Sequence, residues 1–282
     1  MYIALDIGGT NIRIGLFENL NKLTKVDQIP AYPLFDKAQN ELIAKLIILL
    51  ENNPVEGIGV CLPGPQIDKE LGAIIKSINL PGWTNKSIKK VLADAFKTKV
   101  LVEHDVVCAA LGESTTLKDT NKFIFVVWGT GVGGAIAEKV SGKFKIIQAE
   151  IGHQIIVIDG NNCPCGQKGC LEAYVGGKSI VRRFGQRLED IKNPGVWDEI
   201  ATKMAQGIIN LNLLNLTELI VFGGGISVHQ PRLVNEVEKI VKKEQKVLEL
   251  PKFKIATYGQ ETALYGCMKL FSTTKNSPET DS

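Results

Sequence analysis

The sequence lacks any long apolar run, since no stretch approaches the ~20 consecutive apolar residues that a membrane-spanning helix needs. The first apolar segment, residues 2–5, is too short for the hydrophobic part of a secretory signal, and Asp6 follows it directly. A strong charge of one sign is also lacking, because 33 basic and 30 acidic residues leave a net charge of +3. These absences argue against export and against nucleic acid or a membrane as partner. We therefore expect a cytoplasmic protein.

The chain of 282 residues is 44% hydrophobic and 22% charged, which is ordinary for globular proteins and sufficient for two domains with their own cores. Only its end is poor in apolar residues, so we expect residues 274–282 to be disordered. Six cysteines are present. In a reducing compartment they are expected as free thiols or metal ligands rather than disulfides.

A glycine-rich pattern occurs twice along the chain. Residues 2–17 form two apolar segments around Gly8 and Gly9, a pattern typical of two strands joined by a tight turn. Residues 123–138 repeat it around the glycine-rich turn 129–134. Such a repeat indicates two similar α/β domains, which we expect to face each other across a cleft.

Between and after these hairpins, apolar periodicity alternates between strand and helix. A strand over 100–103 meets a helix over 106–115 at His104 and Asp105, where ligands gather in doubly wound sheets. We expect a small domain of residues 1–112 plus 261–273 and a larger one of residues 113–260. The remaining predicted helices are 41–50, 85–96, 178–188, 199–214 and 261–271, and the remaining strands are 57–62 and 219–222.

The first glycine motif, residues 6–13, has the composition of a phosphate cradle. Glycines let backbone N–H groups approach phosphate oxygens closely. Asp6 could hold Mg²⁺ through water, while Thr10 and Arg13 could donate to phosphates. An ordinary hairpin would show the same short motif, but its recurrence at 129–134 favours two cradles for one nucleotide.

Three cysteines crowd into residues 163–170, with His153 ten residues before the first of them. Three thiolates and one imidazole form a closed tetrahedral set, typical of structural zinc because no open position remains for substrate. The alternative is an accidental group of cysteines in a loop. The predicted ligands are His153, Cys163, Cys165 and Cys170. The other cysteines have apolar neighbours and are expected in the core: Cys61, Cys108 and Cys267.

Several carboxylates could bind a polyhydroxylated ligand. Glu150 lies three residues before His153, and Glu172 follows the last clustered cysteine by two residues, so a zinc site would fix both. Carboxylates accept hydrogen bonds from sugar hydroxyls, which are both donors and acceptors. Glu103 and Asp105 complete the set. For each of them, a solvated surface group is the simpler alternative.

Together these motifs resemble the ROK family, named for repressors, open reading frames and kinases. The family includes bacterial glucokinases, fructokinases and N-acetylhexosamine kinases. The resemblance implies an actin-like ATPase (ribonuclease H-like) fold, a homodimer and transfer of phosphate from ATP, with Mg²⁺, to the 6-hydroxyl of a hexose, glucose above all. The segments that carry it are, in order, 6–10, 62–65, 79–83, 103–113, 129–134, 150–153, 163–174 and 222–225.

The resemblance also implies roles for individual residues. Asp105 would be the general base on the sugar hydroxyl. The implied sugar-binding residues are Gly64, Asn79, His104, Asp105, Glu150, His153 and Glu172. The implied nucleotide-binding residues are Asp6, Gly8, Gly9, Thr10, Arg13, Thr130, Gly131, Gly133, Gly224 and Gly225.

The chain departs from the family pattern near the sugar site. His104 stands where the family usually has Asn, Val107 replaces a common Asn, and Gly176 replaces a common Ser. A neutral histidine offers one donor and one acceptor on a larger ring, so the sugar pocket is altered or His104 packs structurally beside the base.

Other readings of the function remain open at this point. The sugar could be N-acetylmannosamine, N-acetylglucosamine, mannose or fructose, and polyphosphate could replace ATP. A non-catalytic sugar-binding regulator is the alternative from another class. Intact Asp6, Asp105 and Gly131 argue against it, and we expect no room for a DNA-binding domain before Asp6.

Overall fold

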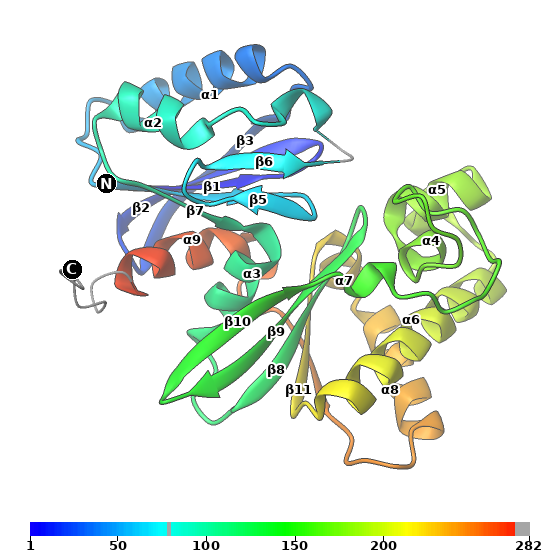
Figure 1. Cartoon of the computed structure of the whole chain (residues 1–282). Coiled ribbons are helices and arrows are strands. Elements are labelled where there is room, and N and C mark those ends of the chain that lie inside the picture. Colours follow the sequence, from blue (N-terminus) through cyan, green and yellow to red (C-terminus); the bar gives the residue numbers. More distant parts are fainter. Residues whose placement is uncertain (78–79, 274–282) are drawn as a thin grey trace. The chain divides into compact units, whose positions relative to one another are not determined.

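The structure is a computed structural model that describes residues 1–77 and 80–273 (Figure 1). The chain divides into two compact units. Unit 1 comprises Met1–Thr115 and the chain from Glu261 onward, and unit 2 comprises Thr116–Gln260. The expected disordered tail, residues 274–282, and the predicted sugar ligand Asn79 lie outside the described residues. Among the helices in those two ranges, none has the length and apolar character to cross a membrane.

Unit 1 is built on a five-stranded sheet with the order β3-β2-β1-β4-β7. The first three strands form an antiparallel meander, and β4 and β7 run parallel to β1. This arrangement brings the carboxyl ends of β1, β4 and β7 to one edge of the sheet. The strands are β1 (Tyr2–Ile7), β2 (Asn11–Asn19), β3 (Lys22–Pro30), β4 (Gly57–Leu62) and β7 (Val100–His104).

Helices cover both faces of this sheet (Figure 1). On one face α1 (Phe35–Leu50) and α2 (Ile88–Phe96) bury apolar side chains against the strands. On the other lie α3 (Asp105–Ser114) and α9 (Thr262–Thr273). Helix α9 packs directly on β4, because a Cβ on Gly59 would lie only 2.8 Å from the Cβ of Cys267. A small two-stranded sheet, β5 (Gln66–Asp68) with β6 (Ala73–Lys76), and the short turn η1 (Pro81–Trp83) complete the unit.

Unit 2 repeats the same plan. Its sheet has the order β10-β9-β8-β11-β12, again an antiparallel meander followed by two strands parallel to the first. The internal repeat predicted from the two glycine hairpins, and with it the prediction of two similar α/β domains, is therefore confirmed. The strands are β8 (Lys122–Trp128), β9 (Val132–Val140), β10 (Lys143–Ala149), β11 (Leu219–Gly223) and β12 (Lys252–Ile255).

The core of unit 2 lies between its sheet and two long helices. Buried Met204 and Ile208 of α6 and Val237 of α8 share one apolar cluster with Ile124 of β8 and Phe222 of β11. The helices are α4 (Glu172–Val175), α5 (Gly177–Phe184), α6 (Pro194–Asn215), α7 (Gly225–His229) and α8 (Pro231–Glu244). Short helical turns η2 (Ile151–His153), η3 (Leu188–Asp190) and η4 (Gly259–Glu261) connect other elements.

Helix boundaries differ from the sequence prediction where capping residues decide them. The helix expected over 178–188 ends at Phe184, because Gly185 adopts a left-handed conformation with φ of 73°. The helix expected from 199 begins at Pro194, where the side chain of Asn193 accepts a hydrogen bond from a backbone N–H of the first turn.

Several strands were not predicted from the sequence. Strands β3 and β10 are edge strands in which exposed charged residues interrupt the apolar pattern. Strand β12, also at an edge, has only four residues. Edge strands form ladder hydrogen bonds with one neighbour only, so their residue pattern carries a weaker signal than that of central strands.

Candidate active site

The polar residues of unit 1 gather at the edge where its parallel strands end. Asp6 of β1 lies opposite Cys61 of β4, which in turn lies opposite Glu103 of β7. His104 ends β7, and Asp105 begins α3 immediately after it. This edge is where open α/β sheets bind their ligands.

Asp6 is held in an environment that opposes its negative charge. Burial is the main cause, and the nearby charge of Asp105 adds to it, so the pKa of Asp6 rises to about 7. The guanidinium of Arg13, 3.7 Å from Asp6 Oδ2, acts in the opposite direction. A carboxyl with such a pKa beside a second carboxylate is a favourable place for a divalent cation, which would neutralise both charges.

The glycine turn beside Asp6 is tight. The N–H of Gly8 donates to the carbonyl of Asn11 at 2.9 Å, and the carbonyl of Thr10 accepts from Ala31 N–H at 2.8 Å. Gly9 is partly exposed and the side chain of Thr10 is exposed at the tip of the turn. The predicted phosphate donors of this motif therefore lie at the surface of unit 1, next to Asp6.

Asp105 uses its two carboxylate oxygens differently. Oδ1 accepts a hydrogen bond from Val106 N–H at 2.7 Å and lies 2.8 Å from His104 Nδ1. Within the described part of the chain, no hydrogen bond reaches Oδ2 of Asp105. This oxygen is thus available to accept a proton from a substrate hydroxyl.

The ring of His104 is buried, with 5% of the residue exposed. Nε2 forms a hydrogen bond with the carbonyl oxygen of Gly64, and Nδ1 faces Asp105. Gly64 has a φ of +117°, and a Cβ there would lie 2.5 Å from the carbonyl oxygen of Lys76. The loop after β4 therefore requires glycine at this position to hold its carbonyl against the His104 ring.

Glu103 was also a candidate site residue from the sequence, but its carboxylate binds other protein groups of unit 1. Its carboxylate lies 2.7 Å from Lys69 Nζ and accepts a hydrogen bond from His104 N–H at 2.8 Å. Sequence reasoning did not identify Lys69 as its partner, because nothing in the local pattern relates residues 34 positions apart. Glu103 therefore supports the conformation of His104.

The second glycine turn, in unit 2, is held by neighbouring backbone. Gly129 N–H donates to Gly131 O at 3.0 Å, while the carbonyls of Gly129 and Thr130 accept from Gly177 and Lys178 N–H groups at 2.9 Å. A Cβ on Gly177 would lie 2.9 Å from Gly129 O, so the absence of a side chain permits this approach. Gly177 was missed by the sequence analysis.

Other predicted nucleotide-binding glycines surround this turn. Gly224 has a φ of +86°, and a Cβ there would lie 2.6 Å from the carbonyl oxygen of Trp128, at the end of β8. Gly225 begins α7, and a Cβ on Gly129 would lie 3.3 Å from the backbone nitrogen of Gly225. Gly133 lies within β9, paired with Val127. Turn 129–131 and residues 224–225 therefore form one backbone-lined surface.

Glu172 connects this turn to the cysteine segment. Its Oε2 accepts a hydrogen bond from Val132 N–H at 2.7 Å. A Cβ on Gly131 would lie 2.3 Å from the same oxygen, so a side chain at position 131 would push the carboxylate out of its present place. The predicted sugar ligand is thus also a support for the predicted phosphate cradle.

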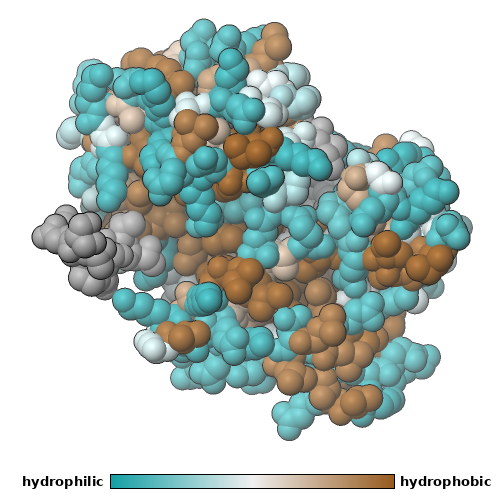
Figure 2. Space-filling model, in the orientation of Figure 1, coloured by the Kyte–Doolittle hydropathy of each residue, from teal (hydrophilic) through white to brown (hydrophobic). Residues whose placement is uncertain are grey.

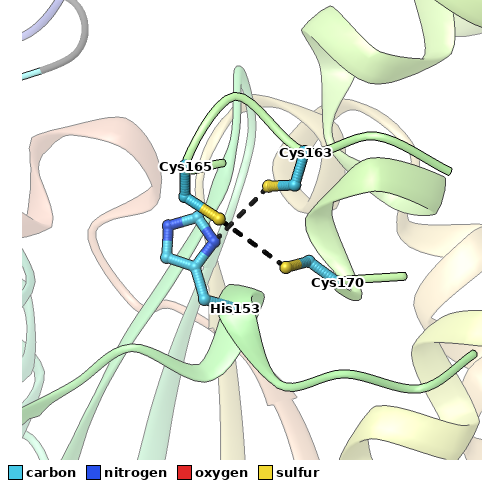
Figure 3. Close-up of side chains that lie close together, drawn as sticks. All are labelled: His153, Cys163, Cys165 and Cys170. Carbon is cyan, nitrogen blue, oxygen red and sulfur yellow. Dashed lines mark hydrogen bonds between the residues drawn. The ribbon is translucent and has the colours of Figure 1, made fainter. Parts of the chain in front are cut away.

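His153 and three cysteines converge in unit 2, with their ligand atoms all within 4.8 Å of one another (Figure 3). Cys165 Sγ lies 3.7 Å from Cys170 Sγ, and Cys163 Sγ lies 3.6 Å from His153 Nδ1. Two thiolates on one tetrahedral zinc ion would be about 3.8 Å apart, and a thiolate and an imidazole nitrogen about 3.6 Å apart. The four predicted ligands therefore fit one tetrahedral metal ion.

The metal-facing and outward-facing nitrogens of His153 are distinct. Nδ1 lies in the cluster, whereas Nε2 lies 3.9 Å from Oε2 of Glu150. Glu150 also accepts a hydrogen bond from the amide of Gln148 at 2.7 Å and is exposed. Gln167, missed by the sequence analysis although it lies within the cysteine segment, accepts from Cys165 and Cys170 Sγ at 3.5 and 3.4 Å.

The other three cysteines form a second group, in unit 1. Cys61, Cys108 and Cys267 are all fully buried, which confirms their predicted place in the core. Their sulfur atoms lie within 4.8 Å of one another, and Cys61 and Cys267 sulfurs are 3.1 Å apart. Burial raises the pKa of the Cys61 and Cys108 thiols, and backbone carbonyls of Ala263 and Leu5 accept from the group. These features suit protonated thiols at Cys61 and Cys108, whereas hydrogen bonds from these two thiols lower the pKa of Cys267 to about 5.

The model of the ROK family matches residues 2–274, nearly the whole described chain. The chain belongs to the ROK family. One curated relative is an N-acetyl-D-glucosamine kinase from Vibrio atlanticus, 27% identical to this ROK protein over 94% of its chain and 98% of the relative. The predicted family resemblance is therefore confirmed.

Solved structures of the family share the fold of this ROK protein. A ROK family glucokinase from Streptomyces griseus, in complex with glucose and AMPPNP, has a TM-score of 0.81 at 23% identity and matches 95% of this chain and 98% of its own. The ROK hexokinase from Thermus thermophilus has a TM-score of 0.78 at 23% identity, over 98% of this chain and 99% of its own. The predicted actin-like ATPase fold is confirmed.

Proposed function

We propose that this ROK protein is a sugar kinase that transfers the γ-phosphate of ATP to the 6-hydroxyl of a hexose. The observation that carries the proposal is the carboxylate of Asp105, whose Oδ1 is hydrogen-bonded while Oδ2 remains available at the ligand-binding edge of the sheet. Family membership and the names of relatives, all sugar kinases among those compared above, support the same activity.

In the proposed reaction Asp105 acts as general base. The oxygen of the 6-hydroxyl forms a bond to the γ-phosphorus, the bond from that phosphorus to the β,γ-bridging oxygen breaks, and ADP leaves. The hydroxyl proton passes to Asp105 Oδ2. Phosphoryl transfer depends mainly on positioning and charge stabilisation, so a fixed carboxylate is a sufficient base.

The phosphates would be bound by the two glycine turns. Asp6, Thr10 and Arg13, with Gly8 and Gly9, are the proposed phosphate and Mg²⁺ residues of unit 1. Bound Mg²⁺ would supply positive charge to the β- and γ-phosphates. The proposed phosphate-binding residues of unit 2 are Thr130, Gly131, Gly133, Gly224 and Gly225. The raised pKa of Asp6 supports this role, because a carboxyl crowded by a second carboxylate gains most from a nearby cation.

The remaining proposed sugar ligands are Glu150, His153 and Glu172 in unit 2 and Gly64 in unit 1, with Asn79. Glucose is the proposed substrate, in keeping with the glucose-bound relative of similar fold. N-acetylglucosamine is the second candidate, favoured by curated relatives at 24–27% identity. The two sugars differ only in the substituent at C2, so residues near that carbon would decide between them.

We also propose that His153 and the three neighbouring cysteines bind one structural zinc ion. The distances from Cys163 Sγ to His153 Nδ1 and from Cys165 Sγ to Cys170 Sγ agree with tetrahedral geometry, which supports this assignment. All four positions are filled by protein ligands, so the ion would fix the loop and its adjacent residues Glu150 and Glu172, without contacting substrate.

A homodimer is proposed as well. Leu214 and Val247 are 83% and 82% exposed in unit 2, and a hydrogen bond of 3.3 Å from Asn212 to Gln245 ties their two segments together. Apolar side chains also gather over the region of α6 and α8 in the space-filling view (Figure 2). An exposed apolar surface of this kind suits a partner subunit.

The direct test measures ADP release from MgATP over a panel of sugars. Glucose, mannose, fructose, N-acetylglucosamine and N-acetylmannosamine are compared at equal concentrations, and the assay is repeated with polyphosphate as donor. We expect turnover with glucose and formation of glucose 6-phosphate. 6-Deoxyglucose, which lacks the accepting hydroxyl, is the matched control.

The outcomes separate the parts of the proposal. No ADP release with any sugar would overturn the kinase assignment and favour a non-catalytic sugar-binding regulator. Turnover of 6-deoxyglucose at the rate of glucose would contradict transfer to the 6-hydroxyl. A higher kcat/KM for N-acetylglucosamine than for glucose would reassign the substrate and leave the reaction unchanged.

A further inference from the structure

The His104 ring lies between two acceptor groups of the protein. Nε2 bonds to the carbonyl of Gly64, and Nδ1 lies 2.8 Å from Oδ1 of Asp105. Both nitrogens of a buried ring are therefore engaged within unit 1. This arrangement differs from the sugar contact that the family resemblance implies for position 104.

The two partners determine where the ring carries protons. A carbonyl oxygen cannot donate, so Nε2 must carry the hydrogen of its bond to Gly64. At 2.8 Å, a bare Nδ1 and an ionised carboxylate oxygen would repel each other, and a proton on Nδ1 turns this contact into a charge-assisted hydrogen bond. Val106 N–H donates a long hydrogen bond of 3.4 Å to Nδ1 and a shorter one of 2.7 Å to Asp105 Oδ1. A proton on Nδ1 replaces the longer bond and leaves the ring positively charged beside the Asp105 carboxylate.

We propose that His104 is the positioning residue of Asp105: its ring, anchored through Nε2 on Gly64, donates from Nδ1 to Oδ1 and directs Oδ2 toward the substrate hydroxyl. This inference rests on the proposed function, in which Asp105 is the base. Two donors, Val106 N–H and His104 Nδ1, then hold Oδ1, and the carboxylate cannot rotate without losing both. His104 acts through Asp105 and does not itself bind sugar.

The backbone supports this role of the ring. Glu103 accepts from His104 N–H at 2.8 Å while paired with Lys69, which fixes the end of β7 from which the ring projects. The positive φ of Gly64 fixes the opposing carbonyl. A ring held at both ends can set the direction of a carboxylate more firmly than a single flexible donor.

Amide substitutions separate the two ring contacts. In His104→Asn the side-chain amide nitrogen occupies the place of Nδ1 and can still donate to Asp105. In His104→Gln it occupies the place of Nε2 and can donate only to Gly64. We expect His104→Asn to retain kcat within about 3-fold, whereas His104→Gln and His104→Ala lose roughly 10- to 100-fold. The KM for sugar should change less than about 3-fold in all variants that fold.

His229→Asn is the matched control, since His229 is exposed in unit 2 and contacts Gln260. Its kinetics should match the wild type. A rise in sugar KM at unchanged kcat for His104→Ala would mean that His104 binds sugar, and would overturn the proposal. Equal kcat for the Asn and Gln variants would overturn it as well, since a merely structural ring does not distinguish its two nitrogens.

A second readout does not depend on turnover. In ¹⁵N NMR of the full chain near neutral pH, we expect His104 Nδ1 to be protonated in the wild type. In Asp105→Asn, where the amide can donate to the ring, Nδ1 should lose its proton. An unprotonated Nδ1 in the wild type would overturn the proposal. If no sugar is phosphorylated but Nδ1 is protonated as expected, the kinase assignment fails and the His104–Asp105 hydrogen bond stands.

Discussion

Glu172 accepts a hydrogen bond from the backbone N–H of Val132 at 2.7 Å, so one carboxylate ties the cysteine segment to the second glycine turn. Only one of its oxygens takes part in this bond. Because Glu172 follows Cys170 by two residues, displacement of the cysteine segment should disturb this glycine turn, the proposed phosphate cradle of unit 2. Glu172 thus has two roles, support of the glycine turn and proposed binding of sugar, and substitutions at this position can separate them.

Glu172→Gln keeps an oxygen that can accept from Val132 N–H but removes the charge. We expect a raised KM for sugar with a nearly unchanged KM for ATP. Glu172→Ala removes the acceptor too and should raise the KM for ATP by about 10-fold, the effect of losing roughly 1–2 kcal/mol of hydrogen bonding. Steady-state kinetics check both, with exposed Glu189→Gln as control. Equal ATP KM values in the two variants would contradict the supporting role.

Asp105→Asn tests the proposed base. The amide cannot accept the hydroxyl proton, so we expect kcat to fall about 100- to 10,000-fold while sugar affinity, measured by calorimetry, changes little. Asp94→Asn, on the exposed face of α2, is the control and should leave kcat unchanged. Retained kcat in Asp105→Asn would remove this residue from the base role.

The proposed metal site leads us to expect about one zinc ion per chain. Cys165→Ser should lose zinc and lower the thermal midpoint, because bound metal contributes directly to folding free energy. Cys108→Ala removes a thiol from the core of unit 1 and should keep the full zinc content. Elemental analysis checks the metal, and a folded wild-type protein without zinc would refute the site.

The raised pKa of Asp6 makes stability depend on pH. Between its ordinary pKa near 3.8 and its folded value of about 7, the unfolded chain ionises freely while folded Asp6 keeps its proton. Stability therefore falls as pH rises through this window and levels off above pH 7. The side chain is 22% exposed, so solvent moderates the effect, which we expect to be on the order of 2 kcal/mol.

Asp6→Asn removes this ionisation. Its thermal midpoint should exceed that of the wild type at pH 8, and the difference should shrink toward pH 4.5, where Asp6 is protonated in the folded protein. Mg²⁺ should raise the midpoint of the wild type at pH 8 and leave that of Asp6→Asn nearly unchanged. A difference between the two proteins that does not vary with pH would contradict the raised pKa.

Gly64 and Gly142 form a matched pair, since both have positive φ but only Gly64 is crowded. A Cβ at Gly64 would lie 2.5 Å from Lys76 O, whereas nothing lies within 4 Å of one at Gly142. We expect Gly142→Ala to cost about 1 kcal/mol and Gly64→Ala about 2–4 kcal/mol. Gly64→Ala should also lower kcat by displacing the carbonyl that anchors His104. Equal thermal midpoints in the two variants would contradict the crowding.

Much of the candidate site could be predicted because its signals are local. The cysteine segment carries three ligands within eight residues, and the glycine turns carry their conformational demands in their own residues. Helix starts were harder to predict than the site residues. Helix α6 begins at Pro194 with Asn193 as its N-cap, whereas the apolar pattern used for the prediction begins only at residue 199. Edge strands β3 and β10 were not predicted because exposed charged residues interrupt their alternation of apolar and polar residues, and β12 was not predicted because it has only four residues.

By itself the sequence determined the repeated α/β plan and the family, and it supplied the residues that we propose for metal, phosphate and sugar binding. These follow from residue types at short spacing, where backbone geometry leaves few choices. The tertiary structure alone decided how those residues are used: that Lys69 pairs with Glu103, that Glu172 holds Val132, and that His104 lies between Gly64 and Asp105. Such contacts join distant segments, or depend on which way a side chain turns, and packing fixes both only when the chain has folded.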